Sequence, residues 1–226
     1  MCGRYSIVID PAKILNQFGI AIDLPPGGIP ENYNVAPTQN GLVLTDKQPN
    51  QLSLFRWGLV PFWAKELKIG ARMINARSEN IEGKPSFRDP IRKQRCLVIG
   101  DSFYEWKREG RSKQPMRILP DDGGLLVMAG IWSSWRNPNE EGAETINTYS
   151  IITTTPNEEM KDIHDRMPVI FPLASQRDAW LNKELPLSEV LALLQPPPPA
   201  TLKFYPVNAA VGNVRNNGPE LHEAIF

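Results

Sequence analysis

The distribution of proline limits what this chain can fold into more than any other feature of its sequence. Proline makes up 22 of the 226 residues, roughly twice its usual share of about 5%. A proline ring fixes φ and removes a hydrogen-bond donor, so it interrupts helices and the centres of sheets. We therefore expect short strands joined by many turns. The consecutive prolines at 196–199 predict an extended connector before a last strand.

Short runs rich in β-branched and aromatic residues alternate with turn signals along the rest of the chain. Strand-like runs occupy residues 5–9, 42–46, 52–60, 95–100, 102–107, 115–119, 125–132, 148–154, 168–171 and 202–207. A loop is expected over 31–41, in front of the second of these runs. Helices are expected at 11–20, 157–164, 174–181 and 187–194. The pattern predicts a single α+β domain over residues 1–226, with a mostly antiparallel, barrel-like β core and peripheral helices.

Composition excludes several classes of protein. No stretch approaches the roughly 20 apolar residues that span a bilayer, and no apolar run follows a basic head as in a signal peptide, so we expect a cytoplasmic protein with no membrane partner. The 25 basic and 25 acidic residues give a formal net charge of zero, which argues against sequence-independent binding of polyanions. With Cys2 and Cys96 as the only cysteines and two histidines, neither a disulfide, a metal site nor a cofactor is expected.

Four short stretches place a chemically capable residue beside strand-like sequence. They read "MCGR" at 1–4, "INARSE" at 74–79, "FYEWK" at 103–107 and "IHDRMPVI" at 163–170. The signatures GxxxxGK[ST], HExxH and GxSxG are missing from the chain. Any chemistry must therefore come from residues scattered along the sequence.

Cys2 has an ordinary explanation, as a small buried hydrophobe or part of a frayed terminus. The alternative is chemical, because a small second residue allows Met1 to be removed. An N-terminal cysteine would then carry an α-amine with a pKa of about 8 and a thiol with a pKa of about 8.5 on adjacent carbons. An aldehyde can form an imine with that amine, and the sulfur can close a five-membered thiazolidine ring.

Three further residues have both a structural and a catalytic interpretation. Glu105 could point out of the sheet into solvent, or point inward among aromatic residues, where its raised pKa would suit acid–base work. His164 could be a structural histidine beside Asp165, or a proton shuttle near neutral pH. Asn75 could cap a turn, or its amide could orient an amine or an oxyanion.

Basic and aromatic residues near these motifs are also open to two explanations. Arg77 and Arg166 could lie on a solvated face or in salt bridges, or could contact phosphates. Trp57, Phe62 and Trp63, in the stretch "WGLVPFW", could pack in the core or form a platform on which bases stack.

The order of the motifs is more specific than any one of them. "MCGR", "NVAP", "WGLVP", "INARSE", "SFYEW", "IHDRMPV", "VGNV" and "NNGPEL" follow one another between residue 2 and about residue 221. This order resembles the SRAP family, the SOS response-associated peptidase domain, which includes proteins that crosslink to abasic sites in DNA. The resemblance covers essentially the whole chain.

The resemblance implies catalytic roles for four residues. Cys2 matches the residue that forms the thiazolidine with the ring-opened sugar aldehyde of an abasic site. Asn75 matches the asparagine that positions the N-terminal cysteine and the sugar, and Glu105 matches the acid–base glutamate that assists ring opening. His164 matches the histidine associated with proton transfer at the sugar and with reversal of the crosslink.

The same matching implies a set of DNA contacts. Arg4 and Arg77 match phosphate contacts, and Pro37 and Trp63 match the wedge and the platform that shape the DNA. Two more residues, Trp106 and Arg166, are expected at the DNA interface.

The function implied by the resemblance is the shielding of abasic sites in single-stranded DNA, or at junctions with a duplex, by covalent capture on Cys2. We expect a monomer that associates with the nucleoid when it is bound to DNA, with possible lyase and autopeptidase activities. Two alternatives stay open. One is a cysteine-type peptidase or amidohydrolase whose minimal reaction removes Met1, and the other is a noncatalytic module that binds single strands.

Overall fold

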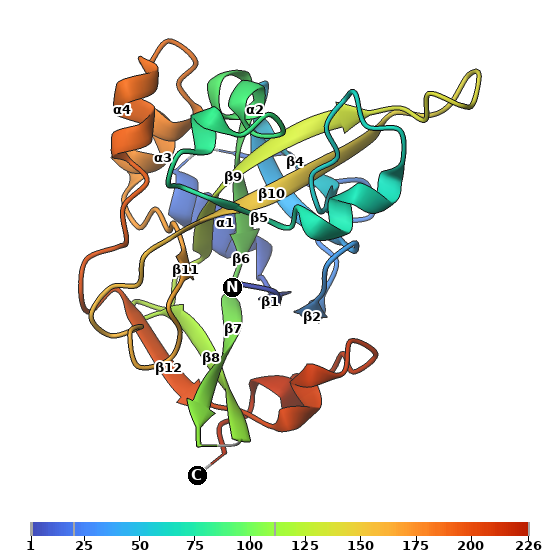
Figure 1. Ribbon diagram of the computed structural model, residues 1–226. Coiled ribbons are helices and arrows are strands. Elements are labelled where there is room, and N and C mark those ends of the chain that lie inside the picture. Colours follow the sequence, from blue (N-terminus) through green and yellow to red (C-terminus); the bar gives the residue numbers. More distant parts are fainter. Residues whose placement is uncertain (1, 20, 111, 226) are drawn as a thin grey trace.

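A closed five-stranded barrel forms the centre of the fold (Figure 1). The structure is a computed structural model that describes residues 2–19, 21–110 and 112–225. The barrel strands are β3 (Asn40–Thr45), β4 (Gln48–Trp57), β6 (Arg95–Gly100), β9 (Leu126–Trp135) and β10 (Ile146–Thr154). They pair in the order β10-β4-β3-β6-β9, and β9 pairs back with β10 to close the ring. All of these pairs are antiparallel except β4 with β10.

Two short strands extend the edges of β10. Strand β5 (Asn75–Arg77) pairs with β10 in parallel, at Ile151 to Thr153, just beyond the two residues of β10 that pair with the end of β4. Strand β11 (Met167–Pro168) pairs antiparallel with the last residues of β10. Strand β10 therefore pairs with segments of two of the sequence motifs: β5 begins at Asn75, and β11 follows His164 by three residues.

A second sheet, antiparallel throughout, packs beside the barrel. Its strands, in spatial order, are β12 (Leu202–Pro206), β8 (Ser112–Pro120), β7 (Ser102–Glu109), β1 (Tyr5–Ile7) and β2 (Asn32–Val35). Only Asp101 separates β6 from β7, so one extended stretch of chain passes from the barrel into this sheet (Figure 1). That passage brings the N-terminal strand β1 and the "FYEWK" strand β7 together as neighbours.

Burial explains why these runs form strands. All six residues of β6 are buried, as are nine of the ten residues of β9, which fits strands covered on both faces. The hydroxyls of Tyr5, on β1 of the second sheet, and of Tyr149, on β10 of the barrel, lie 2.5 Å apart. A Cβ at Gly41 would collide with both hydroxyl oxygens. Only glycine fits at that position of β3 while both tyrosines keep their places.

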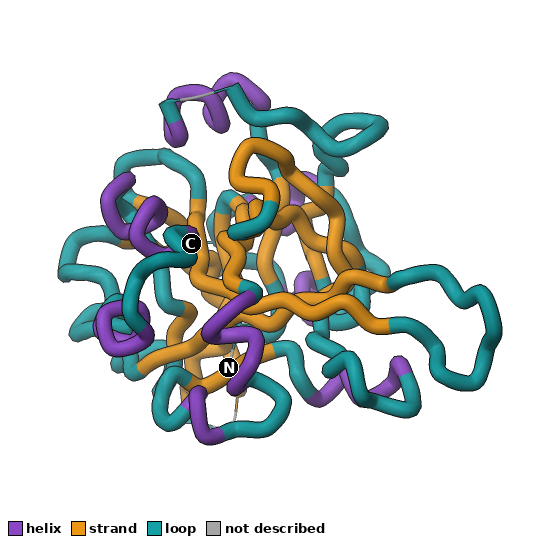
Figure 2. Tube along the Cα trace, turned by 90° about the horizontal axis from the view of Figure 1, so that it is seen from above, coloured by secondary structure: helices purple, strands orange, loops and turns teal. Residues whose placement is uncertain are grey.

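The helices lie around the outside of the strands (Figure 2). They are α1 (Pro11–Phe18), α2 (Arg88–Lys93), α3 (Ala174–Leu181) and α4 (Leu187–Ala192), with short 3-10 turns η1 (Leu67–Arg72), η2 (Ile81–Gly83), η3 (Ala209–Gly212) and η4 (Pro219–His222). Asp10 caps α1 by accepting from the Ala12 N–H, and Gly19 ends it with φ +68°. Among the described residues, no helix is long and apolar enough to cross a membrane.

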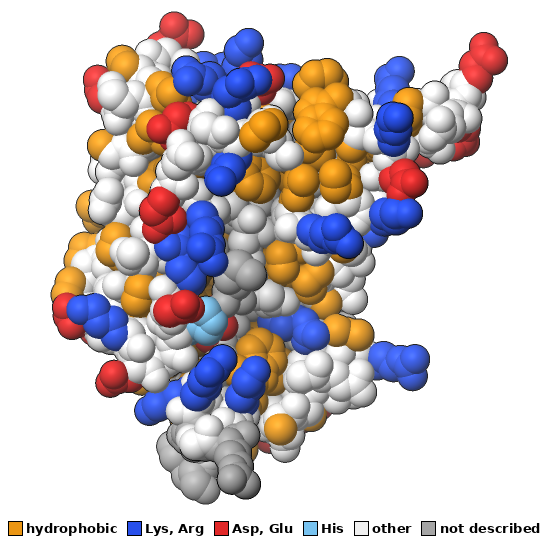
Figure 3. Space-filling model, viewed as in Figure 1, with side chains coloured by type: hydrophobic (Ala, Val, Ile, Leu, Met, Phe, Trp, Pro, Cys, Tyr) orange, Lys and Arg blue, Asp and Glu red, His pale blue; other side chains and the backbone are white. Residues whose placement is uncertain are grey.

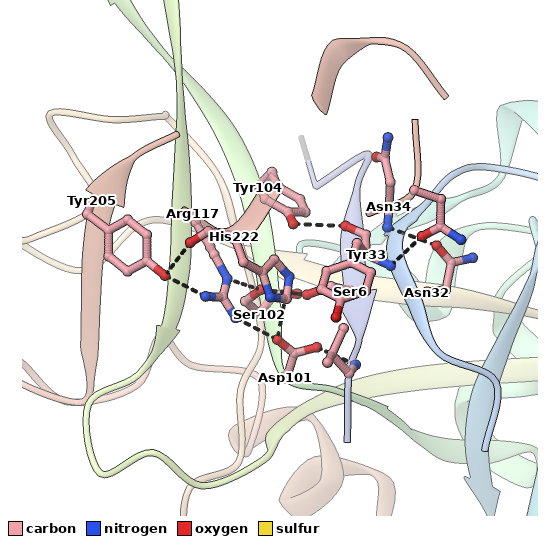
Figure 4. Close-up of polar contacts among 12 residues, drawn as sticks. Ser6, Asn32, Tyr33, Asn34, Asp101, Ser102, Tyr104, Arg117, Tyr205 and His222 are labelled. Atoms are coloured by element: carbon pink, nitrogen blue, oxygen red, sulfur yellow. Dashed lines mark hydrogen bonds and ion pairs between the residues drawn. The ribbon is translucent and has the colours of Figure 1, made fainter. Parts of the chain in front are cut away.

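Polar contacts fasten the C-terminal segment to the second sheet (Figure 4). The Arg117 guanidinium lies 2.8 Å from an Asp101 carboxylate oxygen and also contacts the Tyr205 hydroxyl. That hydroxyl donates to the His222 carbonyl at 3.1 Å. At the other end of the same sheet, on β2, the Asn34 amide nitrogen lies within 3.2 Å of three carbonyl oxygens of the segment 211–216. The C-terminal segment is therefore held close to the N-terminal strand.

The expected α+β class, with a mostly antiparallel barrel-like core and peripheral helices, is confirmed. The helices expected at 11–20, 174–181 and 187–194 are present within those ranges, although Ile20 lies outside the described residues. The connector at 196–199 has no regular secondary structure and leads into β12, as expected.

Three local predictions were wrong. Residues 157–164 form consecutive turns instead of a helix, because the Asn157 side chain accepts from the Met160 N–H and the Ile163 N–H bonds to the Met160 carbonyl, which closes separate turns. Residues 32–35 are strand β2 instead of loop, since β1 supplies their partner. The strand expected at 168–171 is reduced to β11 and an isolated bridge between Ile170 and Met128.

Candidate functional site

Four segments that are distant in sequence meet where the barrel adjoins the second sheet. Cys2 precedes β1, Asn75 opens β5, Glu105 lies in the middle of β7, and His164 ends the turns that precede β11. The Asn75 amide Nδ2 donates to the Cys2 carbonyl at 2.8 Å, and the His164 Nε2 lies 3.8 Å from the Glu105 Oε2. The Glu105 charge also acts on the Cys2 thiol. The structure thus brings together the four residues to which the resemblance assigns catalytic roles.

The Cys2 thiol is fully buried, and its Sγ lies 3.9 Å from the Arg4 carbonyl oxygen. Burial raises the pKa of this thiol far above its ordinary value, and the neighbouring Glu105 charge raises it further. Loss of solvent penalises the thiolate, and a carboxylate nearby repels it. At neutral pH the sulfur therefore carries its proton.

Glu105 points inward from β7, with 2% of its surface exposed. Burial raises the pKa of this carboxyl to about 7, because the charged form loses its hydration. The carboxyl is therefore present in both protonation states near neutral pH. A group in that condition can donate and accept protons in one reaction.

His164 is oriented by the residues that follow it. The Arg166 backbone N–H lies 3.0 Å from Nδ1, and the ring turns its other nitrogen, Nε2, toward Glu105. Burial lowers the pKa of this imidazole. The exposed Asp165 carboxylate, 2.8 Å from Nδ1, acts in the opposite direction. The His164 Nε2, 3.8 Å from the Glu105 Oε2, is the nitrogen placed to exchange a proton with Glu105.

Only one of the two polar atoms of the Asn75 side-chain amide makes a hydrogen bond with the described residues. Its Nδ2 holds the Cys2 backbone, whereas its Oδ1 is buried and accepts no hydrogen bond from the described residues. A buried acceptor without a donor costs free energy. The backbone of β5 is fixed by its pairing with Ile151 of β10, so the Oδ1 is a rigidly placed acceptor beside Cys2.

The three arginines expected to contact DNA have different environments. Arg77 is exposed at the end of β5. Arg4 is half-buried, and its guanidinium donates to the Val211 carbonyl at 3.0 Å and to the Gly212 carbonyl at 3.4 Å. Only Arg77 thus has its whole guanidinium available to a ligand, while Arg4 also holds the C-terminal segment.

Arg166 is occupied inside the protein. Its side chain is 10% exposed, and its guanidinium contacts both Glu79 carboxylate oxygens, at 2.5 and 3.0 Å, and the Thr153 carbonyl at 2.6 Å. This placement favours the salt-bridge alternative for Arg166. Since its backbone N–H also orients His164, Arg166 fixes the turn that carries the histidine.

The aromatic candidates separate by exposure. Trp57 is fully buried and donates its indole N–H to the Ile74 carbonyl at 2.9 Å, so it follows the core-packing alternative. Phe62 and Trp63 are 70% and 51% exposed, which is unusual for large apolar side chains. Trp106 and Pro37 are each partly exposed. Phe62 and Trp63 therefore present an aromatic surface that the fold does not use.

A pocket of about 430 Å³ lies against His164, and sequence reasoning did not anticipate it. Its lining comprises Trp106, Arg108, Lys161, Asp162, Ile163, His164 and Asp165. The alternation of side chains along a strand offered one signal, because it places Arg108 on the same face of β7 as Trp106. Lys and Arg side chains lie above and below the histidine visible on this face (Figure 3). Among the described residues, no group of His, Cys, Asp and Glu could hold a metal ion.

Comparison with known proteins relates this site to a family. The model of the SOS response associated peptidase (SRAP) family matches residues 1–214. The abasic site processing protein YoqW of Bacillus subtilis is 45% identical, over 99% of this chain and 100% of YoqW. The abasic site processing protein HMCES of Gallus gallus is 35% identical, over 84% of this chain and 65% of HMCES. A crystal structure of a Bacteroides thetaiotaomicron protein, 28% identical, covers 100% of both chains with a TM-score of 0.87.

Proposed function

Because the chain belongs to the SOS response associated peptidase (SRAP) family, we propose that it processes abasic sites in single-stranded DNA by covalent capture on Cys2. Relatives similar over their full length are abasic site processing proteins. The observation that carries the proposal is the convergence of the Cys2 backbone, the Asn75 amide, the Glu105 carboxyl and the His164 imidazole. These groups supply a nucleophile, an orienting amide and two proton carriers.

The reaction requires that Met1 be removed, which frees the α-amine of Cys2. The amine attacks the aldehyde carbon C1′ of the ring-opened sugar, and loss of water gives an imine. The Cys2 sulfur then adds to the imine carbon while the thiol proton passes to the nitrogen. A five-membered thiazolidine joins the protein to the DNA, and no oxidant or reductant is consumed.

Glu105 has the protonation behaviour that these steps need. In its acid form it protonates the sugar ring oxygen as the closed sugar opens to the aldehyde, and in its base form it accepts a proton from the attacking amine. Its pKa of about 7 makes both forms available near neutral pH. His164 lies 3.8 Å away and acts as a second proton carrier, at the sugar and during reversal.

Burial of the Cys2 thiol favours a definite order of steps. Because the pKa of the thiol is raised, the sulfur is a poor nucleophile until a base takes its proton. The amine therefore reacts first, and the thiol follows once the imine has formed beside Glu105. The same burial argues against the peptidase alternative, in which a thiolate would attack a peptide carbonyl at once.

The DNA is expected to run across the exposed residues around the site. Arg77 contacts a phosphate, and Trp63, with Phe62 beside it, offers a surface on which bases stack. Pro37 acts as a wedge at the kink. An abasic nucleotide has no base to unstack, so a kinked strand or a strand ending at a duplex junction binds at low cost. We propose that the protein acts as a monomer in the cytoplasm, at the nucleoid when it is bound to DNA.

Incubation with single-stranded DNA that carries one abasic site, followed by a denaturing gel, tests the proposal. The wild-type protein should give a band that survives heat and denaturant. Cys96→Ala is the matched control, because it removes the other buried cysteine and should leave that band intact. Cys2→Ala keeps the amine, so its imine should be trapped by borohydride but should give no stable band without it.

A residue added ahead of Cys2 that is not removed converts the amine to an amide and leaves the thiol free. This blocked protein should give no band with or without borohydride. A stable adduct from it would mean that the thiol alone or a lysine reacts, and the thiazolidine would be wrong. Cleavage of the added residue without any adduct would favour the peptidase, and equal binding of intact DNA without any adduct would favour the binding module.

A further inference from the structure

The pocket beside His164 has a lining and a size that the capture chemistry does not use. Trp106 and Arg108 come from β7, and the remaining lining residues come from the turn 161–165. Its volume of about 430 Å³ lies within the range of small-molecule sites, about 300–1,000 Å³. A ligand in this pocket would touch the imidazole that faces Glu105. The pocket is therefore placed to influence the reaction without containing the reacting carbon.

The cations of the pocket are available to an anion. Arg108 is exposed and makes no hydrogen bond or ion pair with the residues that the structure describes. Lys161 contacts Glu158 at 2.5 Å, with both side chains more than half exposed, and such surface pairs contribute little stability. Binding a phosphate therefore costs neither Arg108 nor Lys161 a strong interaction within the protein. Trp106, which is partly exposed, offers a ring face for a base.

We propose that this pocket is a subsite for the phosphodiester and base of a nucleotide that adjoins the lesion, with Arg108 as the phosphate contact, and that DNA held there increases the protonation of His164. The proposal rests on the covalent capture proposed above. It adds a positioning residue, Arg108, which acts on the reaction through His164.

The acidic residues of the pocket restrict how the nucleotide is held. Asp162 and Asp165 also line the pocket, and either would repel a phosphate placed near it. Asp165 is already engaged at 2.8 Å from the His164 Nδ1. The favourable position for a phosphate is therefore on the Arg108 side, with the base toward Trp106.

The effect on His164 follows from the charges that face it. Burial lowers the pKa of the imidazole most, and the positive charge of Arg108 lowers it further. Asp165 raises it, and Glu105 lies 3.8 Å from Nε2. A phosphate beside Arg108 offsets that positive charge and, like Asp165, favours the imidazolium. Bound DNA therefore increases the protonation of His164, the residue that donates a proton to it.

The protonation of His164 can be measured directly by NMR. The chain has two histidines, so their ring C2–H signals form a simple spectrum, and loss of a signal in His164→Gln assigns it. His222 serves as an internal reference, since burial lowers its pKa to about 4. The probe is a single strand with a tetrahydrofuran abasic analogue, which has no aldehyde and cannot crosslink.

In the wild type, adding this strand should raise the pKa of His164 and increase its protonated fraction at pH 7 by about two- to tenfold. Arg108→Gln should raise the pKa of His164 in the free protein, and DNA should then produce a smaller further rise. A neutral methylphosphonate in place of the phosphate on one side of the lesion should weaken wild-type binding and abolish the rise. The same replacement should have little effect on DNA binding by Arg108→Gln, because the methylphosphonate and the substitution remove the same contact.

Lys93→Gln is the matched control, because it removes an exposed cation on α2, outside the pocket, and it should behave like the wild type. The inference would be overturned if the His164 signal did not move on DNA binding. It would also be overturned if the effects of Arg108→Gln and of the methylphosphonate on binding were additive at both flanking positions. The denaturing gel separates the two proposals. A wild-type protein that crosslinks while the His164 signal stays fixed refutes only the subsite, whereas a wild-type protein that never crosslinks refutes the capture itself.

Discussion

Replacing Glu105 with glutamine should slow covalent capture and should raise the stability of the variant relative to the wild type as the pH rises toward 8. The change keeps the size and planar shape of the side chain but removes its titratable proton. Glu105 is 2% exposed, and burial raises its pKa from an ordinary 4.5 to about 7. One raised pKa therefore has two consequences, one for the rate of the reaction and one for the stability of the protein.

The sign of the stability effect follows from the direction of the shift. A carboxyl whose pKa is higher in the folded chain than in the unfolded chain holds its proton more tightly when folded. Its contribution to stability is full below about pH 4.5, falls as the pH rises, and is lost once the pH exceeds about 7. The gap between pKa values of 4.5 and about 7 corresponds to about 3 kcal/mol.

Urea denaturation of both proteins without DNA, at about pH 4.5 and about pH 8, measures this effect. Titrating groups remote from Glu105 are shared by the two proteins and cancel in the difference. The unfolding free energy of Glu105→Gln relative to the wild type should increase by about 3 kcal/mol from the lower to the higher pH. Over the same range, capture of an abasic strand should be about 10²–10⁴-fold slower in the variant, while noncovalent binding of the tetrahydrofuran strand stays nearly unchanged.

Two results would refute this reasoning. A difference in unfolding free energy that is the same at both pH values would mean that Glu105 does not titrate near neutral pH in the fold. A loss of noncovalent binding as large as the loss of rate would mean that Glu105 has a structural role at the DNA interface and does not transfer protons.

Further predictions concern individual residues of the site. Intact mass should show that the active protein begins at Cys2, and a homogeneous active preparation that retains the initiator methionine would exclude the mechanism. His164→Ala should slow proton transfer and crosslink reversal more than it weakens binding of the tetrahydrofuran strand, as compared by gel kinetics and titration. Arg77→Ala should lower the slope of log affinity against log salt by about 0.7, whereas an unchanged slope would mean that Arg77 does not contact a phosphate. Arg166→Ala should lower the unfolding free energy by about 2–3 kcal/mol, measured in urea, and a stable variant with a reduced salt slope would make Arg166 a phosphate contact after all.

Local sequence signals were sufficient for many elements of the fold. The cap at Asp10, the proline at position 11 and the stop at Gly19 act within a few residues of one another, and α1 forms between them. The apolar run 96–99 of β6 and the proline connector at 196–199 can likewise be recognised from the local sequence alone. The candidate residues Cys2, Asn75, Glu105 and His164 could be singled out by motif order, because each motif is a short contiguous pattern.

Predictions failed where a distant partner decides the local conformation. The segment 32–35 is polar and loop-like by composition, yet it is a strand because β1 offers unpaired backbone groups beside it. The turns at 157–164 take their shape from contacts of Asn157, which also donates to the Pro197 carbonyl. Similarly, an arginine after "IHD" could serve a phosphate or a carboxylate. Only the position of Glu79, 87 residues away along the chain, decides that the Arg166 guanidinium is engaged internally.

The chemistry of the site depends on both levels. The sequence by itself determined which side chains are present, their order, and the possibility of an amine and a thiol on one terminal residue. Tertiary structure alone decided that β10 carries β5 and β11 on its edges and that β7 lies beside β1, which brings residues 2, 75, 105 and 164 together. It also decided the pKa of Glu105, because the free energy of a charge depends on the water removed from it, and that water is excluded only when remote segments pack around the carboxyl.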